Sequence, residues 1–215
     1  MLQNIKLKDS DTILFIGDSI TDVDRRKLEY APLGRGYVNF AANLIIARHA
    51  QISLKVENTG ISGDTVRNLK SRWRTDCLAH NPAVLSILIG INDLWRRFDS
   101  RPEQVANAVF PDEYETTYRE LLREAKAHCN PQMVLMEPFM FCNDPAHQMF
   151  KELPSYIQVV HRLAREFNAV IVPLQTHIDK EIAHVPPQKW SGDMVHPATW
   201  AHAWIAENWL SATSL

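Results

Sequence analysis

The chain has 215 residues, of which 46% are hydrophobic and 22% are charged, and its formal net charge is −2. This mixture is typical of a soluble globular protein and excludes an intrinsically disordered chain. The near balance of 23 basic and 25 acidic side chains gives no electrostatic reason to expect nucleic acid as a partner. Chains of this length commonly fold as one unit, so we expect a single domain over residues 1–215.

The three cysteines, Cys77, Cys129 and Cys142, are widely spaced and form no CxxC pair. The sequence therefore indicates neither a disulfide framework nor a thiolate zinc site, and we expect no metal and no cofactor. Residues 1–11 lack the apolar core of a signal peptide, and no apolar run approaches the ~18–20 residues of a membrane span. We expect a cytoplasmic protein without a membrane partner.

Short apolar runs alternate with longer segments of helical periodicity along the chain. In chain order the pattern predicts a strand at 12–17, a helix at 37–50, a strand at 53–58, a helix at 64–78, a strand at 84–90, a helix at 112–128, a strand at 133–136, a helix at 154–167, a strand at 170–172 and a helix at 197–210. Four of the strands are continuously apolar, as in a parallel sheet covered by helices on both faces. The strand at 53–58 alternates more and is expected nearer an edge.

Two of these helices carry specific expectations. The helix at 64–78 has Asp64 as its expected N-cap, and its basic side chains Arg67, Lys70, Arg72 and Arg74 spread around it as on a solvated surface. The helix at 154–167 is expected to begin at Pro154, because proline is favoured in the first turn.

The strict alternation of strands and helices predicts the fold class. With right-handed crossovers it gives a three-layer α/β/α sandwich around a flavodoxin-like, doubly wound, five-stranded parallel sheet. Ligands bind beyond the carboxyl ends of the strands in such sheets. The residues that follow each strand are therefore the candidates for a functional site.

Polar clusters stand at four of these positions. Ser19 follows the first strand, Gly63 lies in the segment after the second, Asn92 follows the third, and Asp193 and His196 precede the last helix. A serine hydroxyl becomes an effective nucleophile when a histidine takes its proton and a carboxylate orients that histidine. Asp193 and His196, three residues apart, can present both groups from one turn.

The same clusters contain donors for a developing oxyanion. The N–H of Ser19, the N–H of Gly63 and the side-chain amide of Asn92 form the predicted oxyanion hole, in which each donor contributes ~3–4 kcal/mol to lowering the barrier. The residues thus predict acyl transfer by a Ser19–His196–Asp193 triad. The α/β-hydrolase arrangement is excluded, because the chain contains no G-x-S-x-G elbow.

Four sequence blocks carry a family resemblance. GDSI at 17–20, GISGDT at 60–65, GIND at 90–93 and DMVHP at 193–197 resemble, in the same order, the four blocks of the GDSL or SGNH hydrolases. The resemblance covers the chain from about residue 12 to residue 210. It implies Ser19 as nucleophile, Gly63 and Asn92 as oxyanion donors, His196 as base and Asp193 as its orienting acid. The stretches FIGDSITD, NTGISGDTVRNLKSRW, GINDLWRR and DMVHP are most similar to the bacterial xylan acetylesterase branch.

Other interpretations of these residues remain open at this point. Ser19 alone would be a helix-capping serine, and Asp193 with His196 would be a capping aspartate beside a surface histidine or two ligands of a metal site. Trp95 and Trp190 each lie within three residues of a proposed site residue. They are candidates for substrate contact, as walls of a small acyl pocket or as a platform for a sugar ring.

The favoured function is a serine esterase that removes short acyl groups, above all acetyl, from sugar hydroxyls such as those of acetylated xylo-oligosaccharides. The alternative is a lysophospholipase, thioesterase or general carboxylesterase that takes longer acyl chains. A third hypothesis, from another class, is a binding or scaffold protein that has lost activity. The expected partner is a small acetylated carbohydrate or another short-chain ester, and the aromatic-rich last helix is compatible with a homo-oligomer.

Overall fold

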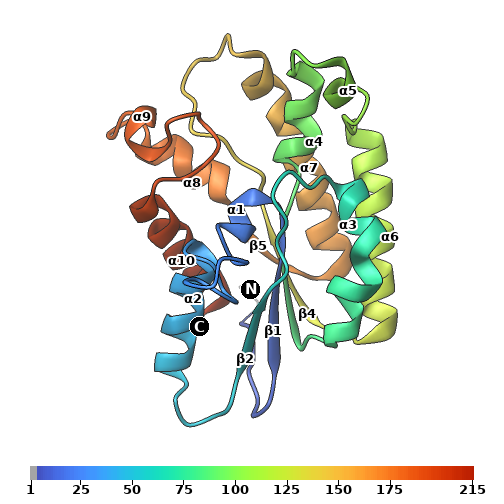
Figure 1. Ribbon diagram of the computed structural model, residues 1–215, viewed down its shortest axis with the longest axis vertical. Coiled ribbons are helices and arrows are strands. Elements are labelled where there is room, and N and C mark those ends of the chain that lie inside the picture. Colours follow the sequence, from blue (N-terminus) through green and yellow to red (C-terminus); the bar gives the residue numbers. More distant parts are fainter. Residues whose placement is uncertain (1–3) are drawn as a thin grey trace.

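A five-stranded, fully parallel sheet forms the centre of the computed structural model, which describes residues 4–215 (Figure 1). The strands are β1 (Thr12–Gly17), β2 (Lys55–Asn58), β3 (Val84–Leu88), β4 (Gln132–Met136) and β5 (Val170–Val172). Their order across the sheet is β2-β1-β3-β4-β5. This is the doubly wound, flavodoxin-like order, so the predicted fold class is confirmed.

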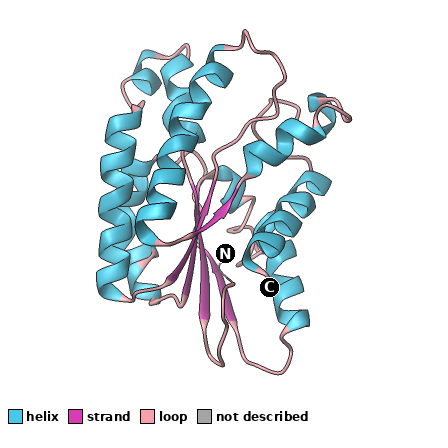
Figure 2. Cartoon of the chain, turned by 180° about the vertical axis from the view of Figure 1, so that it is seen from behind, coloured by secondary structure: helices cyan, strands magenta, loops and turns pink. Residues whose placement is uncertain are grey.

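Helices connect every pair of successive strands, and further helices follow β5. They are α1 (Ser19–Asp22), α2 (Tyr37–Arg48), α3 (Val66–Asp76), η1 (Leu78–His80), α4 (Ile91–Trp95), η2 (Arg96–Phe98), α5 (Pro102–Val105), α6 (Pro111–His128), α7 (Gln148–Phe167), α8 (Leu174–Glu181), α9 (Pro187–Trp190) and α10 (Thr199–Thr213). The helices α3, α6 and α7 cover one face of the sheet, and α2 and α10 pack together on the other (Figures 1 and 2).

The burial of the strands follows from this layering. All five residues of β3 are buried, and β1 is buried from Ile13 to Gly17, because helices cover both faces. The strand β2 lies at the edge, as its alternating pattern predicts, and only Asn58 at its carboxyl end is buried. The last helix reaches into the same core, where the Trp209 indole N–H donates to Ser86 Oγ at 2.9 Å.

The helix after β4 differs from its prediction. α7 begins at Gln148 and contains Pro154 in its interior, although proline removes a backbone donor and is disfavoured there. The apolar stripe that α7 buries against the core already begins at Met149 and continues through Leu153 and Tyr156. Pro154 itself is exposed, so packing of the opposite face outweighs the local preference for a helix start.

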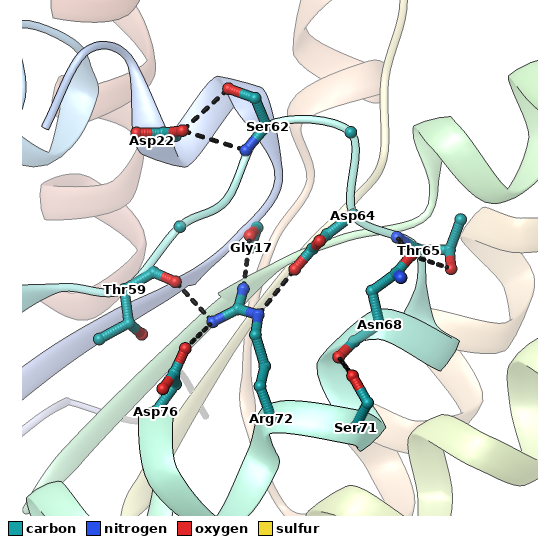
Figure 3. A network of polar contacts seen from close by, with 12 residues as sticks. Gly17, Asp22, Thr59, Ser62, Asp64, Thr65, Asn68, Ser71, Arg72 and Asp76 are labelled. Atoms are coloured by element: carbon teal, nitrogen blue, oxygen red, sulfur yellow. Dashed lines mark hydrogen bonds and ion pairs between the residues drawn. The ribbon is translucent and has the colours of Figure 1, made fainter. Parts of the chain in front are cut away.

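The start of α3 also differs. Its N-cap is Thr65 rather than Asp64, and the Thr65 N–H donates to the side-chain oxygen of Asn68 at 2.9 Å (Figure 3). Asp64 instead accepts a hydrogen bond from Arg72 Nε at 2.7 Å. Asp64, two residues before the first residue of α3, thus forms an ion pair with Arg72 of the same helix.

Arg72 joins the carboxyl ends of β1 and β2 and is not a solvated surface residue as its sequence context predicts. Its guanidinium donates to the carbonyl oxygens of Gly17 at 3.1 Å and Thr59 at 2.7 Å, and also contacts Asp64 and Asp76 (Figure 3). Only 11% of its side chain is exposed. Because Gly17 and Thr59 directly precede two of the predicted site segments, Arg72 fixes the distance between them.

Replacing Arg72 is therefore expected to destabilise the fold. Arg72→Met keeps most of the apolar stem but leaves the Asp64 carboxylate and two carbonyl oxygens without their donor, which costs about 3 kcal/mol. Urea unfolding followed by circular dichroism measures the change. Arg74→Met on the exposed side of α3 is the matched control, and an equal effect of both substitutions would contradict this role of Arg72.

Candidate active site

Ser19 is the first residue of α1 and follows β1 after a tight turn. A Cβ at Gly17 would lie 2.2 Å from the carbonyl oxygen of Leu88, so only glycine lets β1 end this close to β3. Asp18 caps α1, and its Oδ1 accepts the N–H of Ile20 at 3.0 Å. This turn places the Ser19 side chain in a cavity at the carboxyl edge of the sheet.

Asp193 and His196 are held in one turn before α10. Asp193 Oδ1 accepts the N–H groups of Val195 at 3.0 Å and His196 at 2.8 Å, and the hydroxyl of Ser191 at 3.0 Å. Asp193 Oδ2 contacts His196 Nδ1 at 2.6 Å. Met194 takes a left-handed conformation with φ of 68° that makes this tight turn possible.

The carboxyl group of Asp193 is ionised at neutral pH. Burial alone would raise its pKa, but the hydrogen bonds from the His196 ring and from the His196 and Val195 backbone outweigh it and lower the pKa to about 2. The ionised carboxylate therefore holds the proton of His196 on Nδ1. This leaves His196 Nε2 free to accept a proton.

Ser19 and His196 meet from opposite ends of the chain. Ser19 Oγ lies 3.0 Å from His196 Nε2, so the contacts run without a break from Asp193 through His196 to Ser19. This is the geometry of a serine nucleophile with its base and orienting acid. The structure brings together the three residues that the sequence predicts as catalytic.

The predicted oxyanion donors lie beside Ser19. Gly63 has φ of +86°, a left-handed conformation that glycine adopts without strain. The Asn92 side-chain amide donates to the carbonyl oxygen of Asp64 at 3.1 Å, which orients it and leaves its second N–H for a ligand. Within residues 4–215 the N–H groups of Ser19 and Gly63 have no acceptor in the protein. All three residues line the same cavity.

Two side chains that the sequence did not single out for this task fix the Gly63 loop. Asp22 Oδ2 accepts the Ser62 N–H at 3.0 Å and the Ser62 hydroxyl at 2.9 Å (Figure 3). Arg96 Nη2 donates to the Gly63 carbonyl oxygen. Asp22 lies three residues after Ser19, and Arg96 lies four residues after Asn92. A charged side chain one helical turn beyond a predicted site residue was therefore the sequence signal that could have identified both.

The cavity around Ser19 has a volume of about 580 Å³, which lies within the ~300–1,000 Å³ of small-molecule sites. Its lining residues come from five different segments of the chain. They are Ser19, Ile20, Val23, Asp24, Arg35, Ser62, Gly63, Asn92, His196, Pro197, Thr199 and His202.

The two tryptophans proposed for substrate contact occupy different places. The Trp95 ring centroid lies 6.0 Å from that of His196, and Trp95 lines a second cavity of about 440 Å³ on the Asp193 side. Trp190 is 2% exposed and packs against Phe141, Trp200 and Trp204. The structure gives Trp190 a packing role beneath the Asp193–His196 turn in place of the predicted substrate contact. Trp95 stays a candidate.

Two buried carboxyl groups lie directly behind the site. Asp18 and Asp93 are fully buried, and in each of them one carboxyl oxygen, Oδ2, has no partner among the described residues. Burial raises the pKa of both groups to about 7. Asp93 also raises the pKa of Asp18, because one negative charge disfavours a second nearby.

Residues 4–215 contain neither a candidate metal site nor a candidate membrane span. No three histidine, cysteine, aspartate or glutamate side chains in this part of the chain are grouped as ligands of a metal ion would be. No helix of the described part is both long enough and apolar enough to cross a membrane.

Comparisons with known proteins agree with this geometry. An acetylxylan esterase of Geobacillus stearothermophilus is 37% identical, over 96% of this chain and 95% of its own length. A crystal structure of an acetylxylan esterase from that organism superposes with a TM-score of 0.91 at 35% identity, covering 98% of this chain and 97% of the other. Thioesterase 1/protease 1/lysophospholipase L1 of Escherichia coli K12 is 26% identical over 94% of this chain and 82% of that protein.

Further structures of the Geobacillus esterase are of catalytic mutants in which a serine, an aspartate or a histidine is replaced by alanine. The aspartate and the histidine are three positions apart in that chain, as Asp193 and His196 are here. The model of the GDSL-like lipase/acylhydrolase family matches residues 15–204, from the end of β1 into α10. The chain therefore belongs to the GDSL-like lipase/acylhydrolase family and is a carboxylic ester hydrolase.

Proposed function

We propose that this hydrolase removes acetyl groups from the hydroxyls of short xylan-derived sugars through a Ser19–His196–Asp193 triad. The observation that carries the proposal is the unbroken contact from Asp193 Oδ2 through His196 to Ser19 Oγ beside three N–H donors. The similarity to an acetylxylan esterase over almost the whole chain supports the acetyl group and the xylan-derived carrier. The alanine mutants of that esterase, described as catalytic, support the three roles.

The first half of the reaction forms an acyl-enzyme. Ser19 Oγ attacks the ester carbonyl carbon while His196 Nε2 takes the hydroxyl proton, and the π electrons of the carbonyl move onto its oxygen. The N–H groups of Ser19 and Gly63 and the Asn92 amide donate to that oxyanion. The Asp193 carboxylate stabilises the charged imidazole. Collapse of the intermediate breaks the bond to the sugar oxygen, which receives the proton from His196.

The second half repeats these steps with water. His196 Nε2 takes a proton from a water molecule, whose oxygen attacks the acetyl carbon bound to Ser19 Oγ. The same three donors hold the second oxyanion. When the intermediate collapses, Ser19 Oγ leaves with the proton from His196, and acetate is released. Every proton moved in this sequence passes through His196 Nε2.

The buried carboxyl groups of Asp18 and Asp93 suit this chemistry while they are protonated. A neutral carboxyl behind Ser19 and Asn92 adds no negative charge next to the oxyanion. The burial that raises both pKa values comes from the same strand ends that place Ser19 and Asn92.

A longer acyl chain is the second candidate, and one observation favours it. The cavity of about 440 Å³ beside Asp193 is walled by apolar side chains that include Trp95, Phe98, Met140 and Met149. A fatty acyl chain leaving the Ser19 site past Trp95 would reach it. The relative described as a thioesterase and lysophospholipase is less similar to this chain than the acetylxylan esterase is.

A cytoplasmic location and a homo-oligomeric state stay predictions. An exposed Trp200 on α10 is compatible with an interface between copies of the chain. A cytoplasmic esterase would act on short oligosaccharides that the cell has taken up rather than on the polymer.

Replacing the nucleophile should abolish turnover without unfolding the protein. Ser19→Ala is expected to lower kcat for nitrophenyl acetate by about 10⁴-fold or more, because the attacking atom is gone. Ser71→Ala, on the exposed side of α3, is the control and should keep full activity. A serine-reactive phosphonate should label the wild-type protein at residue 19. Near-normal turnover by Ser19→Ala, or no labelling of the active protein, would refute the mechanism and favour a non-catalytic scaffold.

The acyl group is tested by a series of nitrophenyl esters from two to twelve carbons. We expect kcat/KM to fall steeply beyond about four carbons, because no residue that lines the apolar cavity beside Trp95 also lines the Ser19 cavity. Trp95→Ala should flatten this fall by opening the way between the two cavities. An optimum at eight or more carbons in the wild-type protein would instead favour the lipase or thioesterase function.

The buried carboxyl pair predicts an unusual pH dependence of stability. The pKa values of Asp18 and Asp93 are raised from 3.8 to about 7, so the folded protein binds more protons than the unfolded chain between these values. The free energy of unfolding should therefore contain a contribution that falls as the pH rises from about 4 to about 7. Asp93→Asn, which keeps an acceptor for the Val66 N–H, should reduce this fall.

Urea unfolding at a series of pH values measures this effect. Asp112→Asn, at an exposed position on α6, is the control and should leave the pH profile unchanged. An Asp93→Asn profile identical to that of the wild-type protein would show that the buried pair does not titrate in this range.

A further inference from the structure

One side of the Ser19 cavity is formed by charged and polar side chains that the mechanism does not use. Asp24 and Arg35 come from the loop between α1 and α2, and Thr199 and His202 come from α10. Beside them the cavity wall is apolar at Ile20, Val23 and Pro197. Small sites for polar ligands typically combine an apolar wall with a few convergent polar groups.

Asp24 and Arg35 form an ion pair at the cavity wall. Arg35 Nε donates to Asp24 Oδ2 at 2.7 Å, and Lys27 Nζ, which does not line the cavity, lies 3.0 Å from Asp24 Oδ1. The hydrogen bond from Arg35, followed by that from Lys27, lowers the pKa of Asp24. Within the described residues, Arg35 Nη1 and Nη2 have no partner. The ion pair thus offers a ligand in the cavity one hydrogen-bond acceptor, the Asp24 carboxylate, and two donors, Arg35 Nη1 and Nη2.

His202 adds a buried donor. The residue is 5% exposed, and its Nδ1 accepts the Tyr37 N–H at 3.3 Å. Burial, then the charges of Arg35 and His196, lower its pKa to about 4, so the ring is neutral at neutral pH. With Nδ1 as acceptor, the single ring proton is on Nε2. Within residues 4–215, Nε2 has no protein partner, and His202 lines the cavity that contains Ser19.

We propose that Asp24, Arg35 and His202 form a subsite for neighbouring hydroxyls of the sugar ring that leaves as the alcohol. The inference rests on the proposed function and assigns residues to its carbohydrate side. A vicinal diol both donates and accepts hydrogen bonds, and a carboxylate beside a guanidinium offers both complements.

The subsite makes a specific demand on the leaving alcohol. An ester of a sugar gains these hydrogen bonds, whereas an ester of a similar-sized alcohol without further hydroxyls leaves the same groups without partners. Acetylated methyl xyloside and cyclohexyl acetate form such a pair, because both release acetate from a six-membered ring. The ratio of their kcat/KM values therefore measures how much the hydrogen bonds of the subsite contribute, separately from the reaction at the acetyl group.

The experiment measures that ratio in the wild-type protein and in Asp24→Asn, Arg35→Met and His202→Gln. The wild-type ratio is expected to favour the xyloside by at least about tenfold, and Asp24→Asn and Arg35→Met should each reduce it by roughly tenfold. Asparagine tolerates the left-handed backbone at position 24, where φ is 66°. Lys27→Met is the matched control, because Lys27 contacts the same carboxylate without lining the cavity, and it should leave the ratio within about twofold.

A second measurement does not depend on turnover of the sugar ester. Free methyl xyloside should inhibit cyclohexyl acetate hydrolysis by the wild-type protein more strongly than cyclohexanol does, and His202→Gln should weaken that inhibition. If the wild-type kcat/KM ratio favours the xyloside and stays equally high in both Asp24→Asn and Arg35→Met, the subsite is overturned and the proposed function is left intact. A wild-type ratio near one overturns the sugar substrate and the subsite with it.

Discussion

The structure depends on one contact, the 3.0 Å approach of Ser19 Oγ to His196 Nε2 between residues 177 positions apart. Two local turns must be correct to about an ångström for this contact to form. One is the capped turn after β1 that starts α1, and the other is the Asp193–His196 turn that precedes α10. The sheet and the α2–α10 layer set the distance between them. The fold therefore acts chiefly by holding these two turns at the distance that lets Ser19 and His196 meet.

A second layer of interactions fixes the oxyanion donors relative to this contact. Arg72 joins Gly17 to Thr59, and Asp22 and Arg96 hold the loop that contains Gly63. Each of these side chains donates to or accepts from backbone atoms, so each controls the position of the main chain rather than the reacting groups. Rigid placement of donors before substrate arrives is what makes them effective against a developing charge.

Much of this arrangement was predictable from the sequence. Continuous apolar runs predicted four strands of the sheet, and an alternating run predicted the edge strand β2. The residue types at Ser19, Gly63, Asn92, Asp193 and His196 predicted a site that the structure brings together, although their catalytic roles stay predictions. Arg72 was not predictable as a support, because its partners include the carbonyl oxygens of Gly17 and Thr59, which are distant in sequence. The start of α7 was missed because packing of Met149 and Leu153 outweighs the local preference of Pro154. Trp190 was misplaced because sequence proximity to Asp193 does not indicate burial.

The position of α10 has a consequence for biosynthesis. This helix begins three residues after His196 and is anchored in the core by the hydrogen bond from Trp209 to Ser86. A nascent polypeptide thus contains Ser19, Gly63 and Asn92 long before the ribosome has made the element that aligns the base. A translation product that stops before His196 therefore lacks the proposed base, although it already carries Ser19, Gly63 and Asn92.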